Sequence, residues 1–164
     1  MQVLLPLALR IAELLKARGE TVAVAESSTG GLIAAALVAV PGASAYFVGG
    51  AVVYTAAAQR GLLDIPRDQL RGIRASTEAY ARLGAQTMRA RLGTHWAIAE
   101  TGATGPTGNP YGDAAGHSCI AVSGAVERAI TLETGRNDRV DNMYAFAEAA
   151  LRLLLDCLEA APPH

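Results

Sequence analysis

Apolar and polar residues alternate along the chain with two periods, one typical of helices and one typical of strands. A first helix is predicted from about Pro6, a residue tolerated in a first turn, to Gly19. Its apolar positions share one helical face, namely Leu4, Leu7, Ile11, Leu14 and Leu15. The segment "TVAVA" (21–25) then predicts a short β-branched strand, and "GGLIAAALVAV" (30–40) a second helix that ends at Pro41-Gly42.

The same alternation continues to the end of the chain. We expect strands in 45–55, in 94–100 and, as a hairpin around a Ser-Gly turn, in 117–134. Helices are expected in 55–63, in 76–93 with Thr77 as N-cap, and from Arg139 to Leu158. This order predicts an α/β fold with three α/β/α layers. Its mixed, mostly parallel sheet carries a C-terminal antiparallel hairpin, within one domain over 1–164.

Composition and charge narrow the classes of function. Apolar residues make up 51% of the 164 residues, and the net charge is −1 without a basic stripe, which argues against direct nucleic-acid binding. No apolar stretch approaches the length of a membrane span, so we expect no membrane contact and a cytoplasmic location. Three scattered histidines and two distant cysteines have no metal-ligand spacing, and we expect neither a metal nor another cofactor.

The turn "ESSTGG" (26–31) is the first place where the sequence concentrates reactive groups. Its side chains and glycines are Glu26, Ser27, Ser28, Thr29, Gly30 and Gly31. A strand that leads into a helix N-terminus exposes backbone N–H groups, which suit a carboxylate, a phosphate or an oxyanion. One hydroxyl would suffice as a simple helix cap, and the excess favours a site. Whether Ser27 or Ser28 faces it stays open.

A second glycine-rich segment, 100–116, repeats this pattern of strand exit, acid, hydroxyl and glycine. Its candidate binding residues are Thr101, Gly102 and Gly105, and a loop of this length is typically either functional or disordered. If the strands ending at Ala25 and Ala99 are neighbours, both turns face the sheet edge where open α/β sheets bind ligands. Tyr54, at a third strand exit, is either a core aromatic or a residue that covers this site.

Several motifs together resemble a known family. The segments "AESSTGGLIAAALVAVPGASAYFVGGAVVYT", "TGATGPTG" and "GRNDR…AL" are similar to the CinA C-terminal domain, which also occurs as stand-alone nicotinamide mononucleotide (NMN) deamidases. The resemblance covers about Leu5 to Leu158. It implies a metal-independent amidohydrolase that converts the carboxamide of NMN to a carboxylate and releases ammonia.

The resemblance also implies roles for individual residues. The family's serine falls on Ser27 as nucleophile, its tyrosine on Tyr54, the threonine of its T-G-x-A-G-P loop on Thr101, and its G-D-R arginine on Arg139, a candidate phosphate ligand. The chain departs from the family after the tyrosine. S-N-E-A-K is replaced by "TAAAQ", so the lysine position holds Gln59, and a second arginine is replaced near Met143. Glu26, Tyr54 or His117 would then supply the base.

Three hypotheses on function follow. The first is an amidohydrolase for a pyridine nucleotide or a related amide. The second is a catalytically impaired relative that binds a nucleotide-like ligand as a sensor, which Gln59 favours. The third is a partner protein in competence or damage responses, as the family's name implies. In each case we expect a homo-oligomer, and in the first two a small-molecule ligand.

Overall fold

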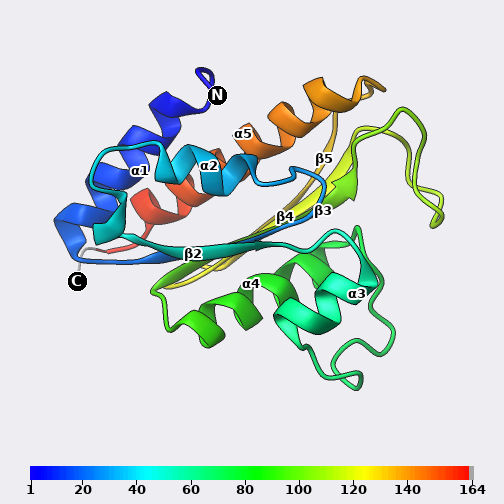
Figure 1. Cartoon of the computed structure of the whole chain (residues 1–164), viewed down its shortest axis with the longest axis horizontal. Helices are drawn as coiled ribbons and strands as arrows, with labels where there is room; N and C mark the ends of the chain where they lie inside the picture. The colour runs from blue at the N-terminus through cyan, green and yellow to red at the C-terminus, as the bar shows by residue number, and fades with distance from the viewer. Residues whose placement is uncertain (163–164) are drawn as a thin grey trace.

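Residues 1–162, the part of the chain that the structure describes, form a five-stranded sheet in the order β2-β1-β3-β4-β5 (Figure 1), as a computed structural model shows. Strand β1 (Val22–Glu26) is parallel to both of its neighbours, β2 (Phe47–Val52) and β3 (Trp96–Ala103). Strand β4 (His117–Ser123) is antiparallel to β3 and to β5 (Arg128–Glu133). Within this sheet β4 therefore runs against the other four strands.

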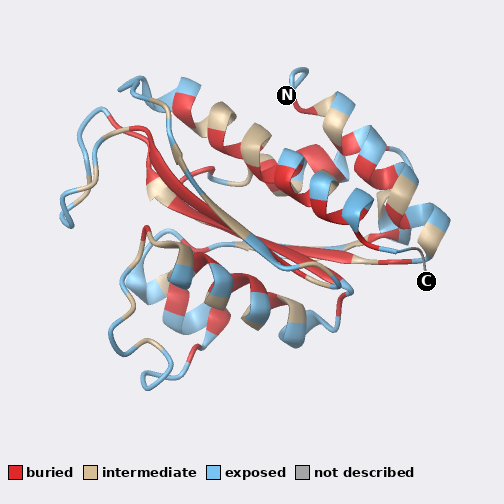
Figure 2. Ribbon diagram, turned by 180° about the vertical axis from the view of Figure 1, so that it is seen from behind, coloured by how far each residue is buried: buried red, intermediate tan, exposed pale blue. Residues whose placement is uncertain are grey.

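Helices cover both faces of the sheet. Helices α1 (Leu5–Arg18), α2 (Leu32–Val38) and α5 (Arg139–Ala160) lie on one face, as Figure 1 shows. Helix α4 (Glu78–Leu92), the short α3 (Ala56–Ala58) and the π-helical turn η2 (Gln59–Leu63) lie on the other. Figure 2 shows the three central strands, β1, β3 and β4, buried between these layers. The predicted fold class, a mixed sheet in three layers with an antiparallel hairpin, is confirmed.

Strict alternation along the strands divides the core into two clusters. Val22 and Val24 of β1, like Trp96 and Ile98 of β3, pack toward α1, α2 and α5. The residues between them are alanines and face α4: Ala23, Ala25, Ala97 and Ala99. Small side chains let the helix approach closely, and a Cβ built on Gly84 of α4 would lie 3.3 Å from the Ala99 Cβ.

Element ends differ from the predictions at three places. Helix α2 begins at Leu32 and ends at Val38, before Pro41. The strand expected in 45–55 begins only at Phe47, because a 3₁₀ turn, η1 (Ala43–Ala45), precedes it. Strand β3 continues to Ala103 because β4 pairs with it as far as Ala103 opposite His117, so the 101–116 segment becomes a loop only at Thr104.

The other predicted boundaries agree closely with the structure. Gly19 ends α1 in the left-handed conformation with φ 64°, and Thr77 caps α4 by accepting a hydrogen bond from the Tyr80 amide. Among residues 1–162, no helix combines the length and the apolar character that crossing a bilayer requires. Residues 163–164 of the expected domain lie outside the described residues.

Candidate functional site

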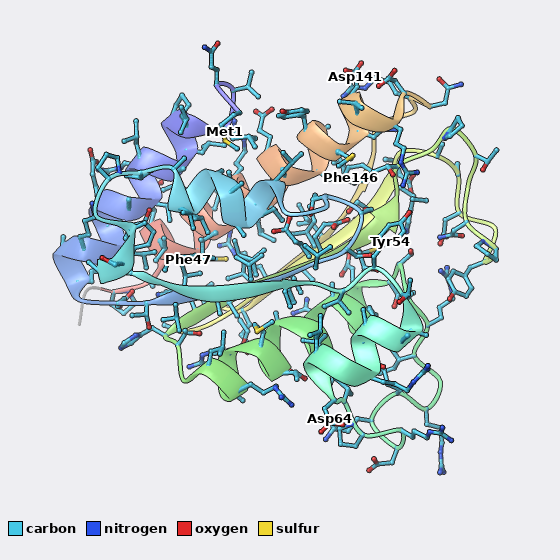
Figure 3. All side chains as sticks on the ribbon, in the orientation of Figure 1. Met1, Phe47, Tyr54, Asp64, Asp141 and Phe146 are labelled. Carbon is cyan, nitrogen blue, oxygen red and sulfur yellow. The ribbon has the colours of Figure 1, made fainter. Side chains whose placement is uncertain are left out.

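The two glycine-rich turns lie at the same edge of the sheet. Ala25 of β1 pairs with Ala99 of β3, so both strands deliver their polar ends side by side. A cleft of about 480 Å³ opens there. Figure 3 shows Tyr54 at this end of the sheet. The cleft residues are Ser27, Val53, Tyr54, Thr55, Ala56, Gln59, Leu70, Ile73, Arg74, Ala75, Ser76, Tyr80, Thr101, Gly102, Asn109, Pro110 and Tyr111.

Beneath the cleft, the carboxylate of Glu100 organises the turn that follows β1. Its Oε2 accepts the backbone N–H groups of Ser27 at 3.1 Å and of Thr29 at 3.0 Å, with the Thr29 hydroxyl at 3.1 Å. Its Oε1 accepts the hydroxyls of Ser28 and of Ser118, the latter at 3.1 Å. Burial raises the pKa of Glu100 above its ordinary value, although the hydrogen bonds from Ser28, Thr29 and Ser27 oppose this shift.

Glu26 caps the N-terminus of α2 with its side chain. Its carboxylate accepts the N–H groups of Ile33 at 3.1 Å and Ala34 at 3.0 Å, and the Thr29 hydroxyl at 2.7 Å. The N-cap residue is Gly31, with no capping side chain of its own. The simple-cap alternative for the three hydroxyls is therefore wrong, because a glutamate from the preceding strand end satisfies these amides.

Three of the amides that this turn was expected to offer to a ligand are already hydrogen-bonded within the protein. The amides of Ser27 and Thr29 point to Glu100, and the Gly30 amide donates to the Ser27 carbonyl at 3.1 Å. The site for negative charge exists, but the protein's own carboxylates fill it. Neither Gly30 nor Gly31 is among the residues that line the cleft.

Ser27 and Ser28 have different surroundings, which separates the two candidates. Ser27 lines the cleft, and within residues 1–162 its hydroxyl makes no hydrogen bond. Ser28 is buried, and its hydroxyl donates to Glu100. Ser27 is thus the hydroxyl of this turn that a ligand in the cleft can reach.

Tyr54 and Arg139 meet at the rim of the site. The Arg139 guanidinium donates to the Tyr54 hydroxyl at 2.7 Å and to the Gly105 carbonyl at 2.6 Å. Tyr54 is 58% exposed, so the alternative of a core aromatic is wrong. The backbone of Gly105 packs closely against Asn137, and a Cβ at this position would lie 2.7 Å from the Asn137 carbonyl oxygen. Arg139 reaches the cleft only through Tyr54.

Gln59 and Thr101 line the interior of the cleft. Gln59 is only 5% exposed, and its Nε2 has no hydrogen-bond partner within the described chain. The Thr101 hydroxyl oxygen accepts the Ser76 amide at 3.1 Å, which leaves its proton free to be donated. Gly102, also a cleft residue, lies in β3 opposite Ser118 of β4. A Cβ on Gly102 would lie 2.5 Å from the His117 carbonyl oxygen.

The cleft also contains residues that the sequence did not reveal. Arg74 is the one charged residue among those that line the cleft in the described chain. It binds both carboxylate oxygens of Asp113, at 2.7 and 3.1 Å, and stacks 5.1 Å from the centre of the Tyr111 ring. This hydrogen bonding lowers the pKa of Asp113 to about 2. Neither "RGIR" nor "NPYGD" carries a motif that would signal the pairing.

His117 is held away from the cleft by acceptors on both ring nitrogens. Nδ1 is hydrogen-bonded to the Glu133 carboxylate, and Nε2 lies 2.9 Å from the Ser76 carbonyl oxygen. Burial lowers its pKa, but Glu133, the Ser76 carbonyl and Asp113 outweigh burial, and the net pKa is raised. A ring with both nitrogens engaged in this way is unsuited to act as a base on Ser27. Within residues 1–162, no three His, Cys, Asp or Glu side chains gather as metal ligands.

Comparison with known proteins agrees with this architecture. The family model described as the CinA C-terminal domain matches residues 5–158. A CinA-like protein of Chlorobium phaeobacteroides is 37% identical over 155 residues, which cover 92% of this chain and 37% of that protein. One from Prochlorococcus marinus is 45% identical over 114 residues, 70% of this chain and 27% of that protein.

Solved structures show the same fold. The competence damage-inducible protein A (ComA) of Klebsiella pneumoniae superposes with a TM-score of 0.89 at 28% identity, covering 96% of this chain and 98% of that one. The competence/damage inducible protein CihA of Agrobacterium tumefaciens gives 0.85 at 30% identity, with 95% of each chain covered. The chain belongs to the CinA C-terminal domain family. It spans about a quarter to two fifths of the length of the curated relatives just described.

Proposed function

We propose that this chain is a metal-independent amidohydrolase that acts on the carboxamide of NMN or a related amide, with Ser27 as nucleophile. One observation carries the proposal. The Ser27 hydroxyl is free at the cleft, whereas its own backbone amide is held 3.1 Å from Glu100 and the neighbouring hydroxyls are tied down. A fixed backbone with the hydroxyl open to the cleft places the Ser27 oxygen where it can reach a bound carbonyl once a base accepts its proton.

The chemistry can be assigned to groups around the cleft. The Ser27 oxygen attacks the amide carbon, the carbon–nitrogen bond breaks, and ammonia leaves with the proton that Ser27 gives up. Donors for the oxyanion are the Gln59 side-chain amide and the Thr101 hydroxyl, both at the cleft. Water then hydrolyses the ester, which yields the carboxylic acid and restores the serine.

Glu100 is our candidate for the group that relays this proton, in place of the family's lysine. A cavity of about 20 Å³, lined by residues that include Ser27, Glu100 and Thr101, adjoins the cleft. This volume accommodates one water molecule. Because burial raises the pKa of Glu100, its carboxylate is a better proton acceptor than an ordinary glutamate.

A second candidate function is binding without turnover. The observation that favours it is Gln59, because an amide cannot take a proton from Ser27 at neutral pH. Such a protein would use the same cleft as a sensor for a nucleotide-like ligand, or as a competence- or damage-related partner. Tyr54 and Arg139 would then serve at the rim as ligand contacts, with Arg139 toward a phosphate.

The decisive experiment measures ammonia and the acid product from NMN with wild type, Ser27→Ala and Ser44→Ala. Ser44 is an exposed serine of η1 and serves as the matched control. We expect Ser27→Ala to lose at least about a hundredfold in rate, while Ser44→Ala keeps the wild-type rate. Equal turnover by Ser27→Ala rejects the nucleophile. Thermal stabilisation by NMN without product identifies the binding function instead.

Other expectations from the sequence stay predictions. Light scattering measures whether several copies assemble, and binding to labelled DNA and RNA tests the expected lack of direct nucleic-acid contact. A fluorescent fusion in bacterial cells locates the chain in the cytoplasm or elsewhere.

A further inference from the structure

The side-chain amide of Gln59 has no partner in a chain that otherwise satisfies its buried polar groups closely. Within residues 1–162, the buried side-chain nitrogens and oxygens without a hydrogen bond are the Gln59 Nε2 and one nitrogen of Arg18. Gln59 is one of the residues that line the cleft, as are Ser27 and Thr101. Native proteins rarely leave such a group unpaired unless a ligand or water completes it.

The backbone holds Gln59 rigidly in this position. Its amide donates to the Thr55 carbonyl at 2.9 Å, and its own carbonyl accepts the Asp64 amide at 3.0 Å, which closes the π-helical turn. Single π-turns of this kind occur often at functional sites. The position of the Gln59 main chain therefore does not depend on a flexible loop.

A carboxamide presents one donor and one acceptor side by side, and its complement is a group with the same pair in reverse order. A carboxylate has only acceptors and leaves the Gln59 oxygen facing another oxygen. Resting on the proposed function, we infer that Gln59 is the specificity-determining residue of the cleft. It recognises the carboxamide of the substrate through two paired hydrogen bonds and discriminates against the carboxylate of the product.

The rest of the cleft fits a planar, weakly charged group at this point. Tyr54, Tyr80 and Tyr111 supply aromatic surface. The charge of Arg74 is already matched by Asp113, so little net positive charge remains to favour a carboxylate. The lactam edge of a nucleobase carries the same donor–acceptor pair, and the experiment separates this source from a carboxamide.

The test measures dissociation constants by calorimetry for NMN, nicotinic acid mononucleotide and uridine monophosphate, with Ser27→Ala as the background so that turnover does not interfere. We expect NMN to bind at least about tenfold more tightly than either of the others. Gln59→Met, which removes both hydrogen bonds, brings the amide-to-acid ratio to about one. Gln59→Lys introduces a positively charged donor and reverses this ratio, so that the acid binds more tightly than the amide. Gln86→Met, at an exposed glutamine on α4, keeps the wild-type ratio.

The outcomes separate this inference from the function on which it rests. If no nucleotide binds at millimolar concentration, the proposed function falls and this inference with it. If amide and acid bind equally well in the wild type, or if Gln59→Met keeps the preference, only the role of Gln59 is overturned. Tighter binding of uridine monophosphate than of NMN assigns the amide of Gln59 to a nucleobase and overturns the carboxamide.

Discussion

Replacing Glu100 with alanine removes the acceptor to which five donor atoms of the site converge. Two of the five are the backbone amides of Ser27 and Thr29, and the others are the hydroxyls of Ser28, Thr29 and Ser118. The hydroxyls can rotate to other acceptors, and the Thr29 hydroxyl keeps Glu26 at 2.7 Å. The two amides are fixed by the chain and lose their partner altogether.

The expected loss of stability follows from these two amides. A buried donor without a partner costs about 1–3 kcal/mol, so Glu100→Ala should lower the free energy of unfolding by about 2–6 kcal/mol. Glu100→Gln keeps one oxygen for the two amides and offers its NH₂ group to the Ser28 and Ser118 oxygens. This variant should lose no more than about 1.5 kcal/mol. For a domain with a total of about 5–15 kcal/mol, the two outcomes are well separated.

Urea titration followed by tryptophan fluorescence measures both variants. Trp96 is the only tryptophan in the sequence and is 1% exposed, so its emission reports the loss of the core. If Glu100→Ala unfolds within 0.5 kcal/mol of Glu100→Gln (about the scatter of such measurements), the carboxylate does not organise the turn.

The pH dependence gives an independent check on the same residue. Because burial raises the pKa of Glu100 in the folded state, the unfolded chain releases this proton first as the pH rises from about 4.5. The contribution of Glu100 to stability is therefore complete below this pH and is lost as the pH rises through the folded pKa. Glu100→Gln lacks this loss, so its stability relative to wild type should improve with increasing pH.

Two further predictions concern the neighbours of the site. The raised pKa of His117, which faces Glu133, Asp113 and the Ser76 carbonyl, adds stability below about pH 6.5 that is lost as the pH rises through the folded pKa. In urea titrations across this range, His117→Gln should lack that loss. Unchanged pH dependence would contradict the ion pairs. Gly102→Ala places a Cβ 2.5 Å from the His117 carbonyl oxygen and should destabilise by at least about 1–3 kcal/mol. Gly61→Ala, with nothing within 4 Å, is its control and should be neutral or slightly stabilising by thermal melting.

The position of the site was accessible from the sequence because it follows from local patterns. Alternation of apolar residues defined the strands, and polar turns after Ala25 and Ala99 had to meet once these strands became parallel neighbours. The resemblance to the family added Ser27, Tyr54, Gln59 and Thr101, all of which line the cleft.

Only the tertiary structure decided which donors and acceptors of the site bond to one another. Glu100 lies more than 70 residues from the turn whose amides it accepts, and Arg74 lies 39 residues from Asp113. A side chain competes for a hydrogen bond with every group brought near it by folding, and local spacing contains no information on that competition. The sequence by itself therefore determined where donors and acceptors gather. The packing of the sheet determined which were consumed internally, and which, like the Ser27 hydroxyl and the Gln59 side-chain nitrogen, have no hydrogen-bond partner within residues 1–162.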